Sequence, residues 1–387
     1  MRDLSRSVHP PAISHDGFAS LATATYRAST IVYPDPQAFA ERKHRGPDGY
    51  TYGLHGTPTT RTLEAQLTAL HQGVRTVLAP SGQAAIALVF LTVLKPGDRV
   101  LIPDSVYGPV KGFCANYLAP RGIRHTVYDP AVGAGIVDLL DDDVRLVWVE
   151  SPGSNTMEVQ DLPAIVAAAH RRGVLVGCDN TWASPLLHKP LALGADFAME
   201  ALTKYVGGHS DLLLGSVTVG DIQQHRALKD TLRMLGVGVS PDDATLALRG
   251  LETMGVRIAH MGRVALALVG EFADHAAIDR ILYPALPGSP GHDLWKRDFA
   301  GASGLFSVVL RPGSEERLMA ALSDLEVFAI GASWGGTCSL IAPQYPAGER
   351  SVVPYSSGVM LRVSIGLEDP DDLRADLRRV FDALAAD

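Results

Sequence analysis

The hydrophobic pattern of the chain changes near residue 60. Residues 1–58 contain many Pro, Gly, His and Tyr residues without a helical or strand period, so we expect an extended N-terminal arm. From Thr62 onward, segments with helical spacing alternate with short apolar segments. The apolar segments predicted to form strands are RTVLAP, RVLIP, RHTVYD, RLVWVE and VLVGCD.

Helices are expected between these strands. TLEAQLTALHQG, GQAAIALVFLTVL and DLPAIVAAAHRRG have helical spacing. In the last of these, Asp161 near the start, Pro163 in the first turn and Gly173 after the end are helix start and stop signals. Strands that are apolar throughout and separated by helices indicate a mostly parallel sheet covered on both faces.

The sequence therefore predicts an α/β protein in three parts. Residues 1–58 form the arm, and residues 59–250 form a large domain around the mostly parallel sheet. Residues 251–387 form a smaller α+β domain, which contains the segments GLFSVVLRP and VMLRVSIG and the closing helical segment DPDDLRADLRRVFDAL. A long amphipathic segment, ETMGVRIAHMGRVALALVGEFADH, lies near the boundary, which we place between residues 245 and 260.

Composition and charge exclude several kinds of partner. The net charge of −8 over 387 residues argues against nucleic acid, and the longest apolar run is about half of what a membrane span requires. The polar N-terminus has no apolar segment after its arginines, so we expect no signal peptide. The thirteen histidines show no metal-ligand spacing, so we expect no metal. The three cysteines contain no CxxC pair, which favours a reducing compartment. We expect a cytoplasmic protein without nucleic-acid or membrane partners.

Three chemically different groups follow predicted strands: the Ser81-Gly82-Gln83 turn, Asp179 and Lys204. Ligands of open parallel sheets bind beyond the carboxyl ends of the strands, so these groups are expected along one edge. Taken singly, each has an ordinary interpretation. Ser81 caps a helix, Asp179 forms a structural salt bridge, and Lys204 is a solvated surface lysine.

Taken together, the three groups match the parts of pyridoxal 5′-phosphate (PLP). A helix N-terminus at Gly82 and Gln83 binds a phosphate, with the Thr203 hydroxyl as a further donor. A carboxylate at Asp179 keeps a heterocyclic nitrogen protonated, and a partly desolvated Lys204 binds the cofactor covalently. Tyr107 is expected to stack on the ring.

Longer motifs carry a resemblance to a known family. ESPGSNTMEVQDLPAI, CDNTW, TKYVGGHSD, SWGG and YPALPGSPGHDLWKRDFAGASGLFSVVL resemble the Cys/Met-metabolism family of fold-type I PLP-dependent enzymes, and within it the cystathionine β-lyase branch. The resemblance extends from Tyr50 to the C-terminus. It implies a fold-type I transferase-like architecture with a seven-stranded sheet, and it implies the cofactor roles given above.

The resemblance also implies how a substrate is held. Arg362 in LRVSIG matches the arginine that binds the substrate α-carboxylate, and Ser333 and Trp334 of SWGG lie beside that carboxylate. Lys204, Tyr52 and Tyr107 are the expected catalytic residues. Tyr52 matches a tyrosine that a neighbouring subunit contributes, so the resemblance implies a homotetramer built as a dimer of dimers.

The reaction implied is β-elimination of L-cystathionine and related cysteine S-conjugates, in methionine biosynthesis, to homocysteine, pyruvate and ammonia. Two sequence features favour it over the γ-acting relatives, namely Trp334, where those relatives usually carry leucine, and ESPGSNTMEV, where they usually read ESPxNP. A γ-acting enzyme is the alternative. A PLP-binding regulatory protein without turnover is a further alternative, disfavoured because the lysine is present and no DNA-binding segment is attached.

Two positions depart from the family pattern. Leu54 stands where the family usually has an arginine that binds the cofactor phosphate together with Tyr52. Either His55 or another basic residue replaces the missing positive charge, or the cofactor is bound more weakly. Cys338 follows SWGGT where glutamate is common, and we expect it to be an ordinary packed cysteine rather than a reactive thiol.

Overall fold

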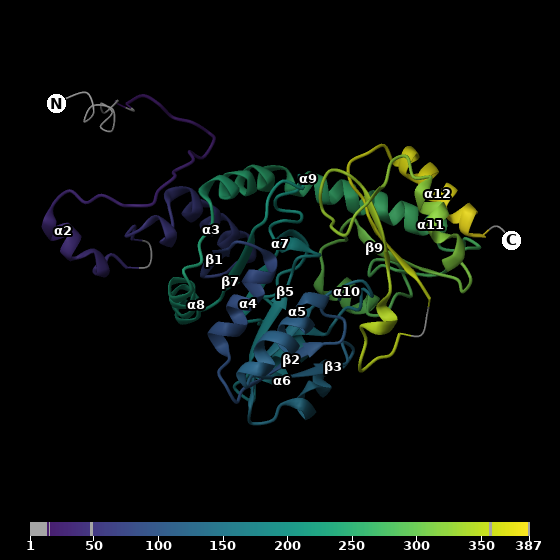
Figure 1. The fold of residues 1–387 in the computed structure, drawn as a ribbon, viewed down its shortest axis with the longest axis horizontal. Helices are drawn as coiled ribbons and strands as arrows, with labels where there is room; N and C mark the ends of the chain where they lie inside the picture. The colour runs from purple at the N-terminus through teal and green to yellow at the C-terminus, as the bar shows by residue number, and fades with distance from the viewer. Residues whose placement is uncertain (1–13, 15, 47–48, 356–357, 386–387) are drawn as a thin grey trace.

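The structure is a computed structural model that describes residues 14, 16–46, 49–355 and 358–385. Its strands form a seven-stranded sheet and a five-stranded sheet (Figure 1). The strands of the larger sheet are β1 (Arg75–Ala79), β2 (Arg99–Pro103), β3 (Arg124–Tyr128), β4 (Val144–Glu150), β5 (Leu175–Asp179), β6 (Phe197–Glu200) and β7 (Gly215–Val219). Those of the smaller sheet are β8 (Ile278–Leu282), β9 (Leu305–Leu310), β10 (Ala329–Ile330), β11 (Leu340–Gln344) and β12 (Met360–Ser364).

Helices precede, separate and cover these strands. The α-helices are α2 (Pro36–Ala40), α3 (Pro58–His71), α4 (Gly82–Val93), α5 (Gly108–Phe113), α6 (Leu162–His170), α7 (Ser184–Leu187), α8 (Ile222–Leu235), α9 (Pro241–Phe272), α10 (His292–Asp298), α11 (Glu315–Ser323) and α12 (Pro370–Ala385). Shorter helical turns are η1 (Arg42–His44), η2 (Gly53–His55), η3 (Cys114–Leu118), η4 (Ala119–Arg121), η5 (Gly133–Leu139) and η6 (Pro346–Gly348).

The order of strands in the larger sheet is β1-β7-β6-β5-β4-β2-β3. Strands β2 to β6 pair in parallel, whereas β7 is antiparallel to both β1 and β6. The predicted α/β class with a mostly parallel seven-stranded sheet is confirmed. The antiparallel direction of β7 does not follow from its hydrophobic pattern, because strand direction is set by the connection between strands.

Local sequence explains where the helices begin. The Ser81 Oγ accepts the backbone N–H of Ala84 at 3.1 Å and caps α4, and Asp161 caps α6 in the same way at 3.3 Å. Asp161 and Pro163 therefore start α6, as the sequence predicts. In α9, Pro241 is the first residue and Ser240 caps the helix by accepting the N–H of Asp242 at 3.1 Å.

Apolar side chains cover both faces of the larger sheet. Along β4, Leu146 and Trp148 belong to one buried cluster, whereas Val147 and Val149 belong to another. Successive residues of a strand point to opposite faces, so the two clusters lie on the two sides of the sheet. This arrangement explains why the central strands β2, β4 and β5 carry apolar residues on both faces instead of at every second position.

Helix α9 connects the two sheets. Its first part, from Ala244 to Met261, packs in a cluster with α3 and with the segment after β6. Its last turns, from Val264 to Phe272, pack in the cluster of the smaller sheet. The predicted boundary at residues 250/251 falls within this continuous helix, and the division into residues 1–58, 59–250 and 251–387 stays a prediction.

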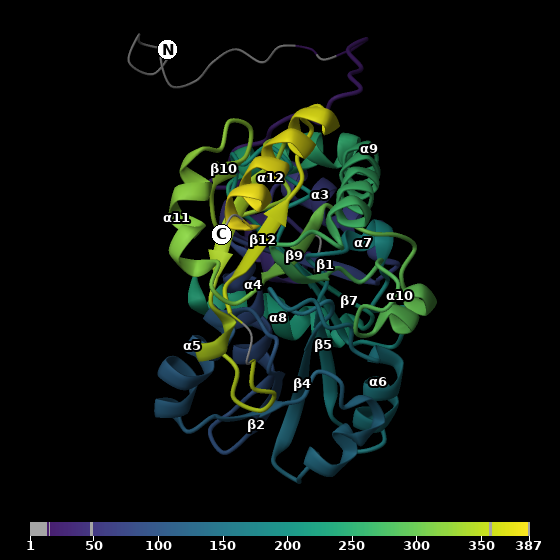
Figure 2. The ribbon, with the colours of Figure 1, turned by 90° about the vertical axis from the view of Figure 1, so that its right-hand side faces the viewer.

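The N-terminal segment that contains α2 lies away from both sheets (Figures 1 and 2). Large apolar side chains on this segment are exposed to solvent, with Phe18 at 77% and Val32 at 87% of full exposure. None of the described helices is long and apolar enough to cross a membrane.

Candidate active site

A cavity of about 330 Å³ lies between the carboxyl ends of the strands of the larger sheet and the loops of the smaller sheet. The Ser81-Gly82-Gln83 turn, Asp179 and Lys204 all line this cavity. Five further predicted site residues line the same cavity, so it contains every residue predicted for the site except Tyr52. The predicted residues that line it are Gly82, Gln83, Tyr107, Asp179, Thr203, Lys204, Ser333, Trp334 and Arg362.

Lys204 follows β6 and reaches the smaller sheet. Its Nζ atom donates to the Oγ atom of Ser333 at 2.8 Å and lies 5.1 Å from the centroid of the Trp334 ring. Burial and, to a smaller extent, the positive charge of Arg362 lower the pKa of Lys204, and Asp179 opposes them, so that the pKa is about 8. The amine is therefore neutral in a substantial fraction of molecules near neutral pH, as a nucleophile or base requires.

Asp179 ends β5 and is buried. Its Oδ1 atom accepts two hydrogen bonds from Thr181, at 2.9 Å from the backbone N–H and at 2.5 Å from the hydroxyl. Burial raises the pKa of Asp179, and the two bonds from Thr181 oppose the rise. Among the described residues, no side chain forms an ion pair with this carboxylate, so the salt-bridge interpretation is wrong here.

A second buried carboxylate lies beside Asp179. Glu150 ends β4 and pairs with Asp179 across the two strands, and its Oε2 atom accepts the backbone N–H of Tyr107 at 2.8 Å. Burial, followed by the neighbouring Asp179, raises the pKa of Glu150 well above its usual range. Glu150 therefore connects the strand end to the segment that carries Tyr107.

The first turn of α4 forms one wall of the cavity. A Cβ atom on Gly82 would lie 2.7 Å from the Cβ atom of Ala201, so glycine allows the helix start to approach the segment after β6. The first backbone N–H groups of a helix have no partner within the helix and attract anions. Thr203 also lines this wall, and its hydroxyl exchanges hydrogen bonds with the backbone of Leu214 at 3.2 and 3.0 Å.

Arg362 projects from β12 into the opposite side of the cavity. Its Nη1 atom donates to the Oδ1 atom of Asn155 at 3.2 Å, and its Nη2 atom donates to the backbone oxygen of Ala332. Burial lowers the pKa of Arg362, although the guanidinium of arginine keeps its charge at physiological pH. The cavity thus holds a fixed positive charge opposite the amine of Lys204.

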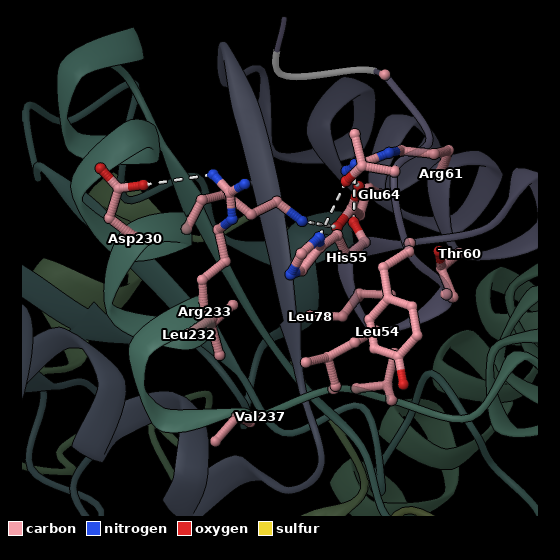
Figure 3. A pocket seen from close by; sticks show the side chains of 18 of the residues that line it. Leu54, His55, Thr60, Arg61, Glu64, Leu78, Asp230, Leu232, Arg233 and Val237 are labelled. Carbon is pink, nitrogen blue, oxygen red and sulfur yellow. Dashed lines mark hydrogen bonds and ion pairs between the residues drawn. The ribbon is translucent and has the colours of Figure 1, made fainter. Parts of the chain in front are cut away.

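Tyr52 does not reach this cavity within one chain. It lies in a separate cavity of about 700 Å³ together with Leu54 and His55. In Figure 3, Leu54 and His55 face a wall of α8 that carries Arg233 and Asp230. Tyr52 is about half exposed at 46%.

The surroundings of His55 disfavour a positive charge on its ring. Burial lowers the pKa of His55, and the nearby Arg233, Lys229 and Arg61 lower it further. The permanent positive charges of this cavity belong to arginine and lysine side chains.

Among the residues that line the Lys204 cavity, Glu150, Asn155 and Thr181 contact predicted site residues through their side chains, and none of them was assigned a role from the sequence. Thr181 follows Asp179 by two residues in the quoted CDNTW motif, and Asn155 belongs to ESPGSNTMEV, so the motifs contained the signal without a role for each position. Cys338 is exposed, so the expectation of a packed cysteine was wrong.

The arrangement fits PLP chemically. The start of α4 is suited to a phosphate, and the buried carboxylate of Asp179 is suited to a protonated ring nitrogen because it lacks a cationic partner in the described part of the chain. Lys204 has an amine with a lowered pKa, about 8, that can attack an aldehyde.

Comparison with known proteins agrees with this chemistry. Residues 5–382 match the family described as Cys/Met metabolism PLP-dependent enzyme. A relative from Rhizobium johnstonii, provisionally named a cystathionine β-lyase, is 43% identical over 363 residues, which cover 93% of this chain and 90% of the relative. The cystathionine β-lyase of Escherichia coli is 39% identical over 363 residues, which cover 92% of each chain.

A solved structure gives the same result for the fold. Cystathionine γ-synthase from Xanthomonas oryzae pv. oryzae superposes with a TM-score of 0.86 at 31% identity and covers 95% of each chain. A family match over nearly the whole chain and relatives above 30% identity leave one assignment. The chain belongs to the Cys/Met-metabolism family of PLP-dependent enzymes.

Proposed function

We propose that this protein is a PLP-dependent carbon–sulfur lyase that carries out β-elimination of L-cystathionine, in methionine biosynthesis. The products are homocysteine, pyruvate and ammonia. The observation that carries the proposal is one cavity in which the amine of Lys204, with its pKa lowered to about 8, lies with the buried carboxylate of Asp179 and the guanidinium of Arg362. Relatives named cystathionine β-lyase support the choice of substrate.

PLP, when bound, supplies an electron sink for the negative charge that develops at the substrate Cα. Lys204 would bind the cofactor covalently, and Asp179 would balance the protonated ring nitrogen. The backbone at Gly82 and Gln83 and the hydroxyl of Thr203 hold the phosphate. The Thr203 hydroxyl forms two hydrogen bonds with Leu214, and the longer one, at 3.2 Å, goes to the Leu214 carbonyl. By giving up this longer bond, the hydroxyl can donate to a phosphate instead. Tyr107, which lines the same cavity, would stack on the ring.

Arg362 and Ser333 bind the α-carboxylate of the substrate. Arginine is suited to this task because its planar fork can donate two parallel hydrogen bonds to one carboxylate. The carboxylate would enter near Ser333, whose hydroxyl lies 2.8 Å from the Nζ atom of Lys204. The α-hydrogen of the substrate is then oriented toward that amine.

Lys204 acts as the base. Once the substrate amine has taken its place on the cofactor, the freed neutral amine of Lys204 would remove the α-proton. The Cβ–S bond would break with its electron pair on sulfur, and a proton would return to the sulfur from Lys204 or Tyr52. Water then converts the remaining three-carbon fragment to pyruvate and ammonia. A pKa of about 8 suits a group that both takes up and returns a proton near neutral pH.

A second copy of the chain completes the site in this proposal. Tyr52 lies outside the Lys204 cavity of its own chain, and the apolar side chains of the N-terminal segment are exposed. Both observations support an assembly in which Tyr52 enters the cavity of a neighbour. We propose a homotetramer of two such dimers, located in the cytoplasm.

Product analysis separates β-elimination from the γ-acting alternative. The indole of Trp334 lies against both Lys204 and Tyr205, with a centroid distance of 5.4 Å to the latter, and we propose that it restricts how the substrate lies. Purified holoenzyme incubated with L-cystathionine is expected to form pyruvate and homocysteine in equal amounts. Formation of 2-oxobutyrate and cysteine would assign a γ-lyase instead. Binding of PLP without any product would favour the regulatory alternative.

A further inference from the structure

We infer that Asn155 is a positioning residue that orients the Arg362 guanidinium for the substrate carboxylate. The inference rests on the proposed role of Arg362. It starts from one contact, in which the Nη1 atom of Arg362 donates to the Oδ1 atom of Asn155 at 3.2 Å. The Nη2 atom of the same group donates to the backbone oxygen of Ala332.

Together the two acceptors define the plane of the guanidinium. Asn155 lies on the loop after β4 of the larger sheet, whereas Arg362 lies on β12 of the smaller sheet and Ala332 on the loop after β10. One acceptor on each terminal nitrogen fixes both the position and the rotation of the group. Two parallel hydrogen bonds to a carboxylate form only when this plane is correct, so the two contacts prepare the carboxylate site before substrate arrives.

The loop that carries Asn155 is itself fixed. The backbone N–H of Ser154 donates to the carbonyl of Ser105 at 2.8 Å, and that of Met157 donates to Gly153 at 3.1 Å. The Nη1 atom of Arg350 donates to the side chains of Thr156 at 2.8 Å and Glu158 at 2.7 Å. The Oδ1 atom of Asn155 is therefore presented to Arg362 from an ordered segment.

The residue type at position 155 satisfies two separate requirements. Its backbone has a φ of 61°, in the left-handed region that asparagine, aspartate and glycine tolerate better than other residues. Its amide oxygen accepts a hydrogen bond without carrying a charge. A carboxylate at this position would neutralise Arg362 and compete with the substrate, whereas an amide leaves the full positive charge for the ligand.

Two substitutions separate these requirements. Asn155→Gly keeps the backbone conformation and removes the amide, and Asn155→Asp keeps the backbone and the shape but adds a negative charge. Each holoenzyme is titrated with glycine, which has an amine and a carboxylate, and with ethanolamine, which has the amine alone. Changes in the visible spectrum of the bound cofactor report binding without turnover.

We expect glycine to bind about 3- to 10-fold more weakly to Asn155→Gly and at least about 10-fold more weakly to Asn155→Asp, because hydrogen bonds to charged groups are among the stronger ones. Ethanolamine binding should stay within about twofold, since it lacks the carboxylate. KM for L-cystathionine should rise together with the loss of glycine affinity, while kcat changes by less than about twofold. This pattern is expected when substrate and transition state lose the same binding energy.

Crystal structures of the cofactor-free variants should show a rotated Arg362 guanidinium. The matched control is Asn116→Asp, at an exposed asparagine outside the residues that line the cavity.

Glycine affinity and KM equal to wild type in both variants would overturn the inference. Equal weakening of glycine and ethanolamine would overturn it as well, because that result indicates general damage to the site. The wild-type measurement separates this inference from the proposed function. If wild-type protein forms pyruvate, unaltered variants refute only the role of Asn155. If wild-type protein forms no product from L-cystathionine, the proposed function fails first.

Discussion

The Nζ atom of Lys204 donates a hydrogen bond to the Oγ atom of Ser333 over 2.8 Å, although 129 residues separate them in the chain. Lys204 follows the last parallel strand of the larger sheet, and Ser333 lies between β10 and β11 of the smaller sheet. The contact brings the candidate base next to the residues proposed to bind the substrate carboxylate. The site therefore depends on how the two sheets pack, and five predictions test its parts and its surroundings.

Replacement of Lys204 by alanine should abolish both cofactor attachment and turnover. We expect pyruvate formation to fall by at least about 10³-fold, because the same amine serves as attachment point and base. The purified variant should also lack the visible absorbance of covalently bound PLP. Thermal melting of the cofactor-free proteins provides the control, and a variant that unfolds at the wild-type temperature yet retains turnover would contradict the role of Lys204.

The rate of cofactor incorporation should depend on pH through Lys204. Its pKa is lowered to about 8, so the amine is mostly protonated below pH 8 and mostly neutral above it. Only the neutral amine attacks an aldehyde. Mixing cofactor-free protein with PLP in a stopped-flow instrument should therefore give a rate that rises about tenfold per pH unit below pH 8 and levels off above it. A rate that is still rising steeply at pH 10 would show an ordinary, solvated lysine.

Replacement of Thr181 by valine should weaken both activity and stability. The Thr181 hydroxyl donates to Asp179 at 2.5 Å and accepts the backbone N–H of Ala201 at 2.9 Å. Its loss raises the pKa of Asp179, so the acid limb of the activity profile should move to higher pH. The unpaired N–H of Ala201 should cost about 1–3 kcal/mol of unfolding free energy. Thr181→Ser, which keeps the hydroxyl, is the matched control and should restore the acid limb.

Replacement of Asp104 by asparagine should destabilise the protein near neutral pH. This buried carboxylate accepts backbone N–H groups from Val352 and Val353 at 2.8 Å each, and the Nζ atom of Lys111 at 3.0 Å. We expect the unfolding free energy at pH 7 to fall by about 3 kcal/mol, as in other buried ion pairs from which one partner is removed. The measurement is urea unfolding of wild type and variant at pH 7.

Urea unfolding of wild type and Asp104→Asn at lower pH tests whether it is the ionised form of Asp104 that stabilises the fold. Hydrogen bonds from the backbone of residues 351–353 and from Lys111 hold the pKa of Asp104 well below its usual range, although burial opposes them. The carboxylate therefore stabilises the fold above the unfolded-state pKa of about 4 and loses this contribution as pH falls toward the folded-state value. The difference between the two proteins should shrink between pH 5 and pH 3, and an unchanged difference would exclude ionisation of Asp104 as its cause.

Mixed oligomers should show whether Tyr52 acts on a neighbouring subunit. Tyr52→Ala and Lys204→Ala proteins are each expected to have little activity, and Tyr52 does not line the Lys204 cavity of its own chain. Co-expression in equal amounts should restore about a quarter of wild-type activity, because half of the dimers are mixed and each mixed dimer keeps one intact site. No recovery in dimers that are shown by mass spectrometry to be mixed would place Tyr52 outside the shared site.

Much of the fold follows from local patterns. Five strands were predicted from short apolar segments, and Asp161 and Pro163 mark the start of α6, because hydrophobic burial and helix capping depend on residues close in sequence. The reversal of β7 and the continuity of α9 across the predicted boundary do not follow from such patterns. They depend on packing between segments that are far apart in the chain.

In the site, too, some features follow from the sequence and others depend on the tertiary structure. The sequence by itself determined the chemistry: Lys204, Asp179 and the Gly82-Gln83 turn lie at or shortly after the ends of strands, and parallel strands bring their carboxyl ends to one edge. Only the tertiary structure decided which groups touch. It brought Asn155 to Arg362 and Thr181 to Asp179, and it lowered the pKa of Lys204 to about 8. It also kept Tyr52 out of the cavity of its own chain. The physical reason is that contact, burial and charge proximity are properties of residues in space, whereas a sequence pattern records only residues that are neighbours along the chain.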